Sequence, residues 1–268
     1  MIEILSDRAV ITLSGADRRK LLHGIITNSL ERLTDAEGLY SALLTPQGKF
    51  LHDFFLFEFQ NILYLDCQKS RADDLVRRLM MYRLRADVEI KKHEALNVFT
   101  SVNSIDHKLS YKDPRHEKMG YRAIVENGTF DAADMSYHKR RISLGIPEGT
   151  YDFIPEKSTI HEGHFEQING VDFKKGCYVG QEVIARMKYR GKIKKAMFPV
   201  TLSGIAAAFG SEITDKKGNK VGDLRSHCDK NAIVLFRIAD MKFGIEYDCC
   251  GIKVTPYKPD FYKDLDDE

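Results

Sequence analysis

Apolar residues recur with two different periods in the first part of the chain. Alternating or continuous apolar runs predict strands, whereas apolar residues three and four positions apart predict helices. The strands expected from the first pattern are 10–13, 39–44, 49–59, 62–67, 88–91 and 96–102. The expected helices are one with apolar positions from Leu21 to Leu33, one after Ser70, and one from Asp134 to Leu144. Strands and helices that alternate in this way indicate an α+β fold.

The strand 49–59 carries large apolar side chains on both of its faces. Successive residues of a strand point to opposite faces, so Asp53 shares one face with Phe55 and Phe57, while His52 lies on the other. Both faces are therefore expected to be covered. In such surroundings Asp53 must be hydrogen-bonded, ion-paired or at a rim, because a bare buried carboxylate is costly.

The second part of the chain has a different texture. Residues 104–118 and 147–169 show no clear period and are expected to form loops, and long ordered loops are often functional. Short apolar runs separated by turn residues then predict a small β-barrel or sandwich. Its expected strands are 198–202, 212–214, 220–225, 232–238 and 251–255. We therefore expect two domains, 1–195 and 196–268.

Composition narrows the class of protein. Hydrophobic residues make up 43% and charged residues 30% of the 268 residues, which excludes a disordered or low-complexity chain. No apolar run approaches about 18 residues, so no membrane partner is expected. The start lacks the features of a secretory signal or an Arg-rich transit peptide. The five cysteines form no C-x-x-C pair, which favours a reduced, cytoplasmic protein, and a monomer is our default expectation.

Positive charge is concentrated in one segment. Residues 173–195 contain eight Lys or Arg and one Glu, a local charge of +7, whereas the whole chain sums to +2. The remaining residues therefore sum to 2 − 7 = −5. This concentration indicates an anionic ligand or partner, with a solvated basic face as the alternative.

Cys177 lies in this segment between two glycines. The glycines permit a tight turn and the close approach of a ligand. The lysines that precede Cys177 favour its thiolate, which is the reactive and metal-binding form. The amide of Gln181 and the carboxylate of Glu182 suit a ring edge that presents N–H donors, such as a pterin. A structural turn with an inert buried cysteine is the alternative interpretation.

The run 175–182, Lys-Gly-Cys-Tyr-Val-Gly-Gln-Glu, resembles the K-G-C-[aromatic]-x-G-Q-E signature of the YgfZ-type folate-binding family. That family is related to the T protein of the glycine cleavage system, a folate-dependent aminomethyltransferase. Further segments match the family in the same order, so the resemblance covers almost the whole chain. They are 15–17, 23–24, 27–28, 44–49, 81–85 and 144–149.

The resemblance implies both a fold and a function. The implied fold is an aminomethyltransferase-like cloverleaf of ferredoxin-like α+β subdomains plus a small C-terminal β-barrel, with tetrahydrofolate or a derivative bound in a central cleft. The implied function is maturation or repair of iron–sulfur enzymes, including tRNA-modifying and lipoate-synthesising radical enzymes. The implied partners are A-type cluster carriers and client enzymes. The compact length resembles the mitochondrial branch of the family and its bacterial relatives.

The resemblance also implies roles for individual residues. Cys177 would be the nucleophile or a transient cluster ligand, Lys175 would hold its thiolate or bind an acidic group, and Asp53 aligns with a carboxylate near the reacting folate nitrogen. The expected folate-binding residues are Glu182, Gln181, Tyr178, Arg186, Thr27, Asn28 and Tyr82. Thr27 and Asn28 could instead cap a helix, and Tyr82 could lie at the exposed end of one.

No metal site is expected, although His161 and His164 have the spacing of ligands on one helical turn. An assembly factor is favoured over a turnover enzyme. The alternative is a folate-dependent one-carbon transferase, but such transfer needs no thiol, and His52 stands where the transferases carry a second acid. A third hypothesis, an RNA-binding module, is disfavoured by the near-neutral net charge and the lack of an RNA-binding motif, so no stable nucleic-acid binding is expected.

Overall fold

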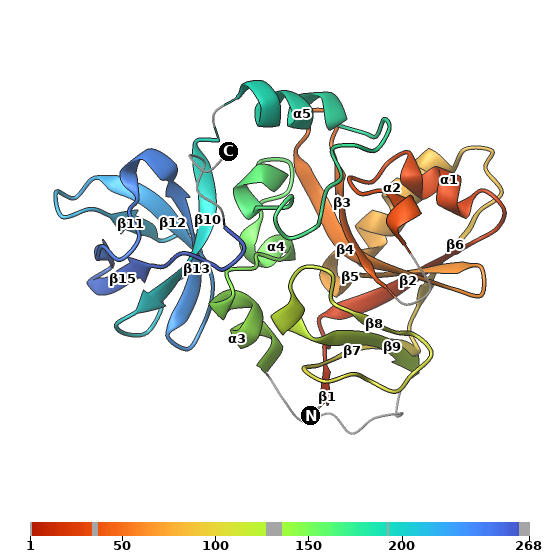
Figure 1. Cartoon of the computed structure of the whole chain (residues 1–268), viewed down its shortest axis with the longest axis horizontal. Helices are drawn as coiled ribbons and strands as arrows, with labels where there is room; N and C mark the ends of the chain where they lie inside the picture. The colour runs from red at the N-terminus through yellow and green to blue at the C-terminus, as the bar shows by residue number, and fades with distance from the viewer. Residues whose placement is uncertain (1, 34–36, 127–135, 192, 263–268) are drawn as a thin grey trace. The chain divides into compact units, whose positions relative to one another are not determined.

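The computed structural model describes residues 2–33, 37–126, 136–191 and 193–262. The chain divides into two compact units (Figure 1). The first contains residues 1–137 and 169–183, and the second contains residues 138–168 and 184–268. The expected domain boundary at residue 195 stays a prediction.

The first unit is built on a five-stranded antiparallel sheet (Figure 1). Its strands, in spatial order, are β3 (Leu39–Leu44), β4 (Phe50–Phe59), β5 (Ile62–Gln68), β2 (Arg8–Ser14) and β6 (Glu89–His93). Helices α1 (Arg18–His23) and α2 (Ala72–Arg83) belong to the same unit. Leu75 and Leu79 of α2 join the apolar core of this sheet with Ile11 and Phe54. Helix α2 is thus held by burial of one apolar face.

A four-stranded sheet completes the first unit. Its strands, in spatial order, are β1 (Ile2–Ile4), β7 (Leu96–Ser101), β9 (Tyr121–Glu126) and β8 (Ser110–Lys112). The rings of Phe57 on β4 and Tyr111 on β8 stack with centroids 5.1 Å apart, so the two sheets pack together. This packing explains why residues 50–57 are all buried, and it confirms that both faces of β4 are covered.

The second unit contains a closed six-stranded barrel, drawn toward the blue end of the scale in Figure 1. Its strands are β10 (Lys195–Leu202), β11 (Glu212–Thr214), β12 (Lys220–Cys228), β13 (Asn231–Arg237), β14 (Tyr247–Cys249) and β15 (Ile252–Pro256). Phe198, Val234 and Phe236 are among its fully buried core residues. Helix α4 (Gly149–Asp152) and the 3₁₀ turn η4 (Ile160–Gly163) also belong to this unit. The predicted α+β fold with a C-terminal β-barrel is therefore confirmed.

Several boundaries differ from the sequence prediction. The helix expected to reach Leu33 is wrong, because α1 ends at His23 and only a 3₁₀ turn, η1 (Leu30–Arg32), follows. Between them Ile26 pairs with Leu43 of β3, so tertiary pairing overrides the helical period. The expected loops also contain β8, α4 and η4, and neither β9 nor helix α5 (Gln181–Arg190) was predicted. Helix α3 (Ser136–Ser143) confirms the third helix, whose predicted start at Asp134 lies outside the described residues.

Candidate functional site

Hydrogen bonds attach the segment that carries Cys177 to residues 23–28 of the same unit. The Thr27 hydroxyl donates to the carbonyl of Gly170 at 2.7 Å, and the amide nitrogen of the Asn28 side chain donates to the carbonyl of Asn169 at 2.7 Å. The backbone amide of Asp172 donates to the carbonyl of Thr27 at 3.1 Å. Thr27 and Asn28 are fully buried, so their polar atoms are used to hold this loop. Their predicted folate contacts stay predictions.

Lys175 makes the strongest of these attachments. Its Nζ donates to three backbone carbonyl oxygens, those of His23 at 2.7 Å, Ile26 at 2.8 Å and Asn28 at 2.9 Å. Burial lowers the pKa of Lys175 to about 8, although the charge of Asp172 opposes this shift. An ammonium has three donor hydrogens, and all three have acceptors here. Lys175 therefore positions the loop through these three hydrogen bonds. Its action on the Cys177 thiolate stays a prediction.

Gly180 fixes the other end of the loop. Its φ is +83°, and a Cβ at this position would lie 2.6 Å from the carbonyl oxygen of Thr45. The close approach to the turn 45–48 therefore requires glycine. Gly176 is different, because a Cβ there would meet nothing within 4 Å among the described residues. Of the two glycines that flank Cys177, only Gly180 is thus required by the backbone conformation and contacts of the described residues.

Cys177 is exposed between these attachments. Tyr178, the next residue, is buried, and the Nζ of Lys175 lies 5.2 Å from the centroid of its ring. The thiol is thus accessible, and the backbone on either side of it is held in place. In contrast, Cys67 and Cys249 are buried, and burial raises the pKa of their thiols to about 12 and about 11. The alternative interpretation is therefore wrong in expecting a buried cysteine, while the reactivity of Cys177 stays a prediction.

The remaining predicted folate-binding residues lie on two helices, α5 and α2. Gln181 and Glu182 open helix α5, where Gln181 is half-buried and Glu182 is exposed. Arg186 is exposed and follows Glu182 by four residues, so the two share one face of α5. Tyr82 lies on α2, where it is half-buried and packs against the apolar core of the sheet. Its predicted role in binding folate is not tested by this placement and stays a prediction.

Asp53 lies inside the first unit. It is buried on β4 and accepts a hydrogen bond of 2.7 Å from the hydroxyl of Tyr40 on the neighbouring strand β3. The expectation that this carboxylate is hydrogen-bonded is confirmed. A carboxylate that acts on a substrate must reach it, and burial between two sheets leaves Asp53 little access, so its catalytic role stays a prediction.

A buried charged cluster near Asp53 was not expected from the sequence. The guanidinium of Arg122 lies 3.9 Å from the centroid of the Phe55 ring and donates from Nε to Asp66 at 2.9 Å. Arg8 donates to the same carboxylate at 2.6 Å, and the guanidinium of Arg115 lies 4.6 Å from the centroid of the Phe55 ring. Arg8, Asp66 and Arg122 are more than 50 residues apart in sequence, so no local spacing could reveal the cluster. Its paired charges connect the two sheets.

The two histidines with ligand spacing bind backbone instead. The Nε2 of His161 lies 2.9 Å from the carbonyl oxygen of Ile184, and that of His164 lies 2.7 Å from the carbonyl oxygen of Met197. Burial lowers the pKa of His164 to about 4, so the ring is neutral near pH 7. Within the described ranges, no three His, Cys, Asp or Glu side chains gather closely enough to hold a metal ion. Over the same ranges, no helix has the length and apolarity needed to cross a bilayer.

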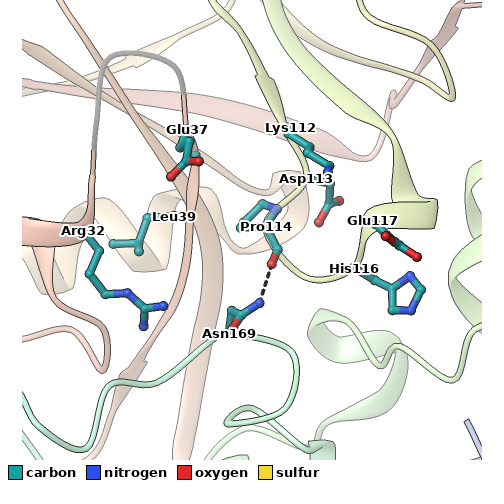
Figure 2. A pocket seen from close by; sticks show the side chains of 10 residues that line it. Arg32, Glu37, Leu39, Lys112, Asp113, Pro114, His116, Glu117 and Asn169 are labelled. Atoms are coloured by element: carbon teal, nitrogen blue, oxygen red, sulfur yellow. Dashed lines mark hydrogen bonds between the residues drawn. The ribbon is translucent and has the colours of Figure 1, made fainter. Parts of the chain in front are cut away.

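Figure 2 shows a cavity of about 290 Å³ in the first unit. Arg32, Glu37, Lys112 and Glu117 bring charges of both signs to it, and the side chain of Asn169 donates to the carbonyl of Pro114 at 2.9 Å across its wall (Figure 2). Among the described residues that line it, none was predicted as a site residue. The cavity therefore adds no support to the predicted folate site.

Comparison with solved structures defines the class of fold. The chain is similar to the glycine cleavage system aminomethyltransferase T from Bartonella henselae, with a TM-score of 0.77 over 97% of this chain and 86% of that one. At 12% sequence identity this likeness shows the fold alone. Residues 194–264 match the family model of the CAF17 C-terminal beta-barrel domain. The chain thus has an aminomethyltransferase-like fold that ends in a CAF17-type barrel.

Comparison with curated proteins shows the family. The chain is 31% identical to the mitochondrial iron-sulfur cluster assembly factor IBA57 of Mus musculus over 77% of this chain and 67% of that protein. It is 30% identical to the Homo sapiens protein of the same name over 83% and 73%. The IBA57 homologue of Neurospora crassa is 31% identical over 74% of this chain, which spans about half, 53%, of that relative. The chain belongs to the IBA57 family of iron–sulfur cluster assembly factors.

Family membership confirms the prediction of an iron–sulfur assembly factor with an aminomethyltransferase-like fold. The narrower assignment to the YgfZ type stays a prediction. The expectation of a cytoplasmic protein is wrong, because these relatives are all described as mitochondrial. The cysteine pattern indicated only that the thiols are reduced, and it could not tell the cytoplasm from another reducing compartment.

Proposed function

We propose that this protein assists the assembly or repair of iron–sulfur clusters, and that the thiol of Cys177 takes part directly. The relatives of the chain are named as iron–sulfur cluster assembly factors, which supports the general role. The direct role of the thiol is supported by the exposure of Cys177 on a loop whose two ends are both fixed. Cysteine thiolate is the usual protein ligand of iron–sulfur iron.

The loop geometry fits transient contact with a cluster. A cluster that passes between proteins must be reached by the donor and released to the acceptor, so its ligand has to lie at a surface. Lys175 and Gly180 limit the movement of the backbone on either side of Cys177. Because the thiol is held in place before the partner arrives, less conformational entropy is lost on binding.

A tetrahydrofolate is the proposed cofactor, and support for it comes from the fold and from two residues. The aminomethyltransferase-like fold is the first support. The second is that Gln181 and Glu182 reach the surface next to the fixed loop, where an amide and a carboxylate can accept from the N–H groups of a pterin. Thr27 and Asn28 fit this role less well, because their polar atoms already bind the loop backbone.

The proposed partners are A-type cluster carriers and iron–sulfur client enzymes, among them tRNA-modifying and lipoate-synthesising radical enzymes. The names of the relatives support contact with iron–sulfur machinery in general terms. The burial of Asp53 favours this role over a one-carbon transferase, because the transferase needs a carboxylate that meets the folate.

The experiment measures aconitase activity and cluster content in cells that lack the protein. We expect full rescue by the wild-type protein and by Cys250→Ala, which removes another exposed thiol, and at least a tenfold lower rescue by Cys177→Ala. Equal rescue by Cys177→Ala, at equal protein level, would overturn the role of the thiol. Failure of the wild-type protein to change any iron–sulfur enzyme, lipoate synthase included, would overturn the general role.

Folate binding is measured separately by calorimetric titration with tetrahydrofolate. We expect Glu182→Ala to weaken binding at least about tenfold, because a lost hydrogen bond to a charged group amounts to about 1.5–3 kcal/mol. Glu212→Ala, which removes an exposed carboxylate of the barrel, is the matched control. If Glu182→Ala binds as tightly as the wild type, the proposed pterin contact is wrong.

A further inference from the structure

Apolar side chains project into solvent from the end of helix α2. Leu84 is 86% exposed, Met81 is 69% exposed and Met80 is 46% exposed. Met80 and Met81 lie in the last turn of α2, which ends at Arg83, and Leu84 follows the helix directly, so the three exposed apolar side chains come from the same end of α2. We call this patch, Met80, Met81 and Leu84, the α2 patch.

Within the α2 patch, Met80 and Met81 lie on the face of the helix that should be polar. In the first turns this solvent face carries the exposed side chains of Asp73 and Arg77, as expected for a surface helix. The opposite face buries Leu75 and Leu79 in the core. The core therefore does not need the apolar side chains of the α2 patch, and their exposure calls for a functional reason.

The backbone at Leu84 is strained. Its φ is +46° and its ψ is −111°, a combination that side chains other than glycine rarely adopt. Such strain is typical of binding sites, where surrounding structure holds a residue in place. Here the strained conformation keeps the most exposed leucine of the first unit in solvent at the end of the helix.

The segment that carries the α2 patch is basic. Residues 69–85 contain six Lys or Arg and two Asp, a sum of 6 − 2 = +4. Both acids are already paired, Asp74 with the arginines at 71, 77 and 78, and Asp73 with Lys92 of β6. The charge that remains for a partner is therefore basic, which favours contact with an acidic surface.

We propose that the α2 patch is a docking site for an acidic segment of another protein, which inserts apolar side chains beside Met81 and Leu84. Methionine side chains adapt to the shape of a partner, and a few apolar anchors inside a polar rim supply most of the affinity of such interfaces. This surface uses none of the residues of the Cys177 loop, so it goes beyond the function proposed above.

The test begins with a photo-cross-linking amino acid placed at Met81 in the full chain in living cells. The same group placed at Ile205, an apolar residue of the barrel that is 89% exposed, is the matched control. Mass spectrometry identifies the cross-linked peptide, which is then synthesised and titrated against the purified protein. We expect an acidic peptide with apolar residues, trapped from Met81 and not from Ile205, that binds more weakly as salt is added.

Two variants separate docking from folding. Leu84→Gly removes the side chain and also relieves the positive φ, so it should fold normally and bind the peptide at least tenfold more weakly. Cys177→Ala should bind the peptide like the wild type, which keeps this result independent of the iron–sulfur experiment. A cross-link to a second copy of this chain, to a lipid or to a peptide without acidic residues, no cross-link at all, or unchanged binding by Leu84→Gly would overturn the proposal.

Discussion

The ammonium nitrogen of Lys175 lies 2.8 Å from the carbonyl oxygen of Ile26, a residue 149 positions earlier in the chain. This bond joins the signature loop to the segment where the predicted first helix stops early. The three carbonyls around Lys175 converge where the chain leaves α1 after His23 and Ile26 pairs with Leu43 of β3. The loop that presents Cys177 and the irregular end of α1 therefore form one structure.

Lys175→Met is expected to release this loop. Three backbone carbonyls lose their charged donor, and buried acceptors without partners each raise the free energy of the closed loop by about 1–3 kcal/mol. Hydrogen exchange of residues 169–180 should become at least tenfold faster, and added ammonium chloride should partly restore protection. Lys174→Met, which removes the neighbouring exposed lysine, is the control. Similar exchange in both variants would contradict the positioning role.

Gly180→Ala is expected to loosen the other end of the loop. A Cβ would lie 2.6 Å from the carbonyl of Thr45 and would meet an unfavourable positive φ. We expect the free energy of unfolding to fall by about 1–3 kcal/mol, measured by urea titration, with faster alkylation or proteolysis near Cys177. Gly176→Ala, where the Cβ meets open space among the described residues, should change stability much less. The reverse order of the two effects would show that the turn 45–48 does not hold the loop.

Acid is expected to destabilise the protein through His52. Burial and the nearby charge of Arg71 lower the pKa of His52 to about 4. The hydrogen bond to Asp74 acts in the opposite direction but is outweighed. The unfolded chain binds this proton near pH 6.5 and the folded chain only near pH 4, so the stability contribution is present above pH 6.5 and is lost as the pH falls toward 4. The loss should be on the order of 3 kcal/mol.

His52→Gln provides the comparison, because its amide can still donate to Asp74 and does not titrate. Chemical denaturation between pH 7 and pH 4 should show a shallower decline for this variant. Parallel curves for the two proteins would assign the acid sensitivity to other groups.

Arg122→Met is expected to weaken the first unit. Arg122 and Asp66 are both fully buried, and removal of one partner of a buried pair typically costs about 3–5 kcal/mol. Arg8 still binds Asp66, so we expect the lower end of this range. Thermal unfolding measures the change, and Arg237→Met, which removes a half-exposed arginine of the barrel, is the control. A stability equal to that of the wild type would mean that Phe55 and its apolar neighbours alone hold the two sheets together.

Local patterns predicted the regular part of this fold. The apolar alternation in 39–44, 49–59 and 62–67 gave strands that the structure confirms as β3, β4 and β5. The short strands after Phe198 predicted a small β-barrel or sandwich, because alternation and turn residues act over a few neighbouring positions, and the structure shows a barrel. The three-residue strand β14 and the single-turn helix α4 carry too few residues for a period to show.

By itself the sequence determined that the chain folds as α+β with a β-barrel, that Cys177 lies between lysines and glycines, and which family the signature run resembles. The tertiary structure alone decided what those neighbours do. Lys175 turns to three carbonyls of a distant segment, Gly180 meets a turn 135 positions earlier, and Leu84 is left in solvent. Spacing along the chain reports faces of helices and strands, whereas the acceptors, contacts and exposure of a side chain depend on segments that meet only when the chain has folded.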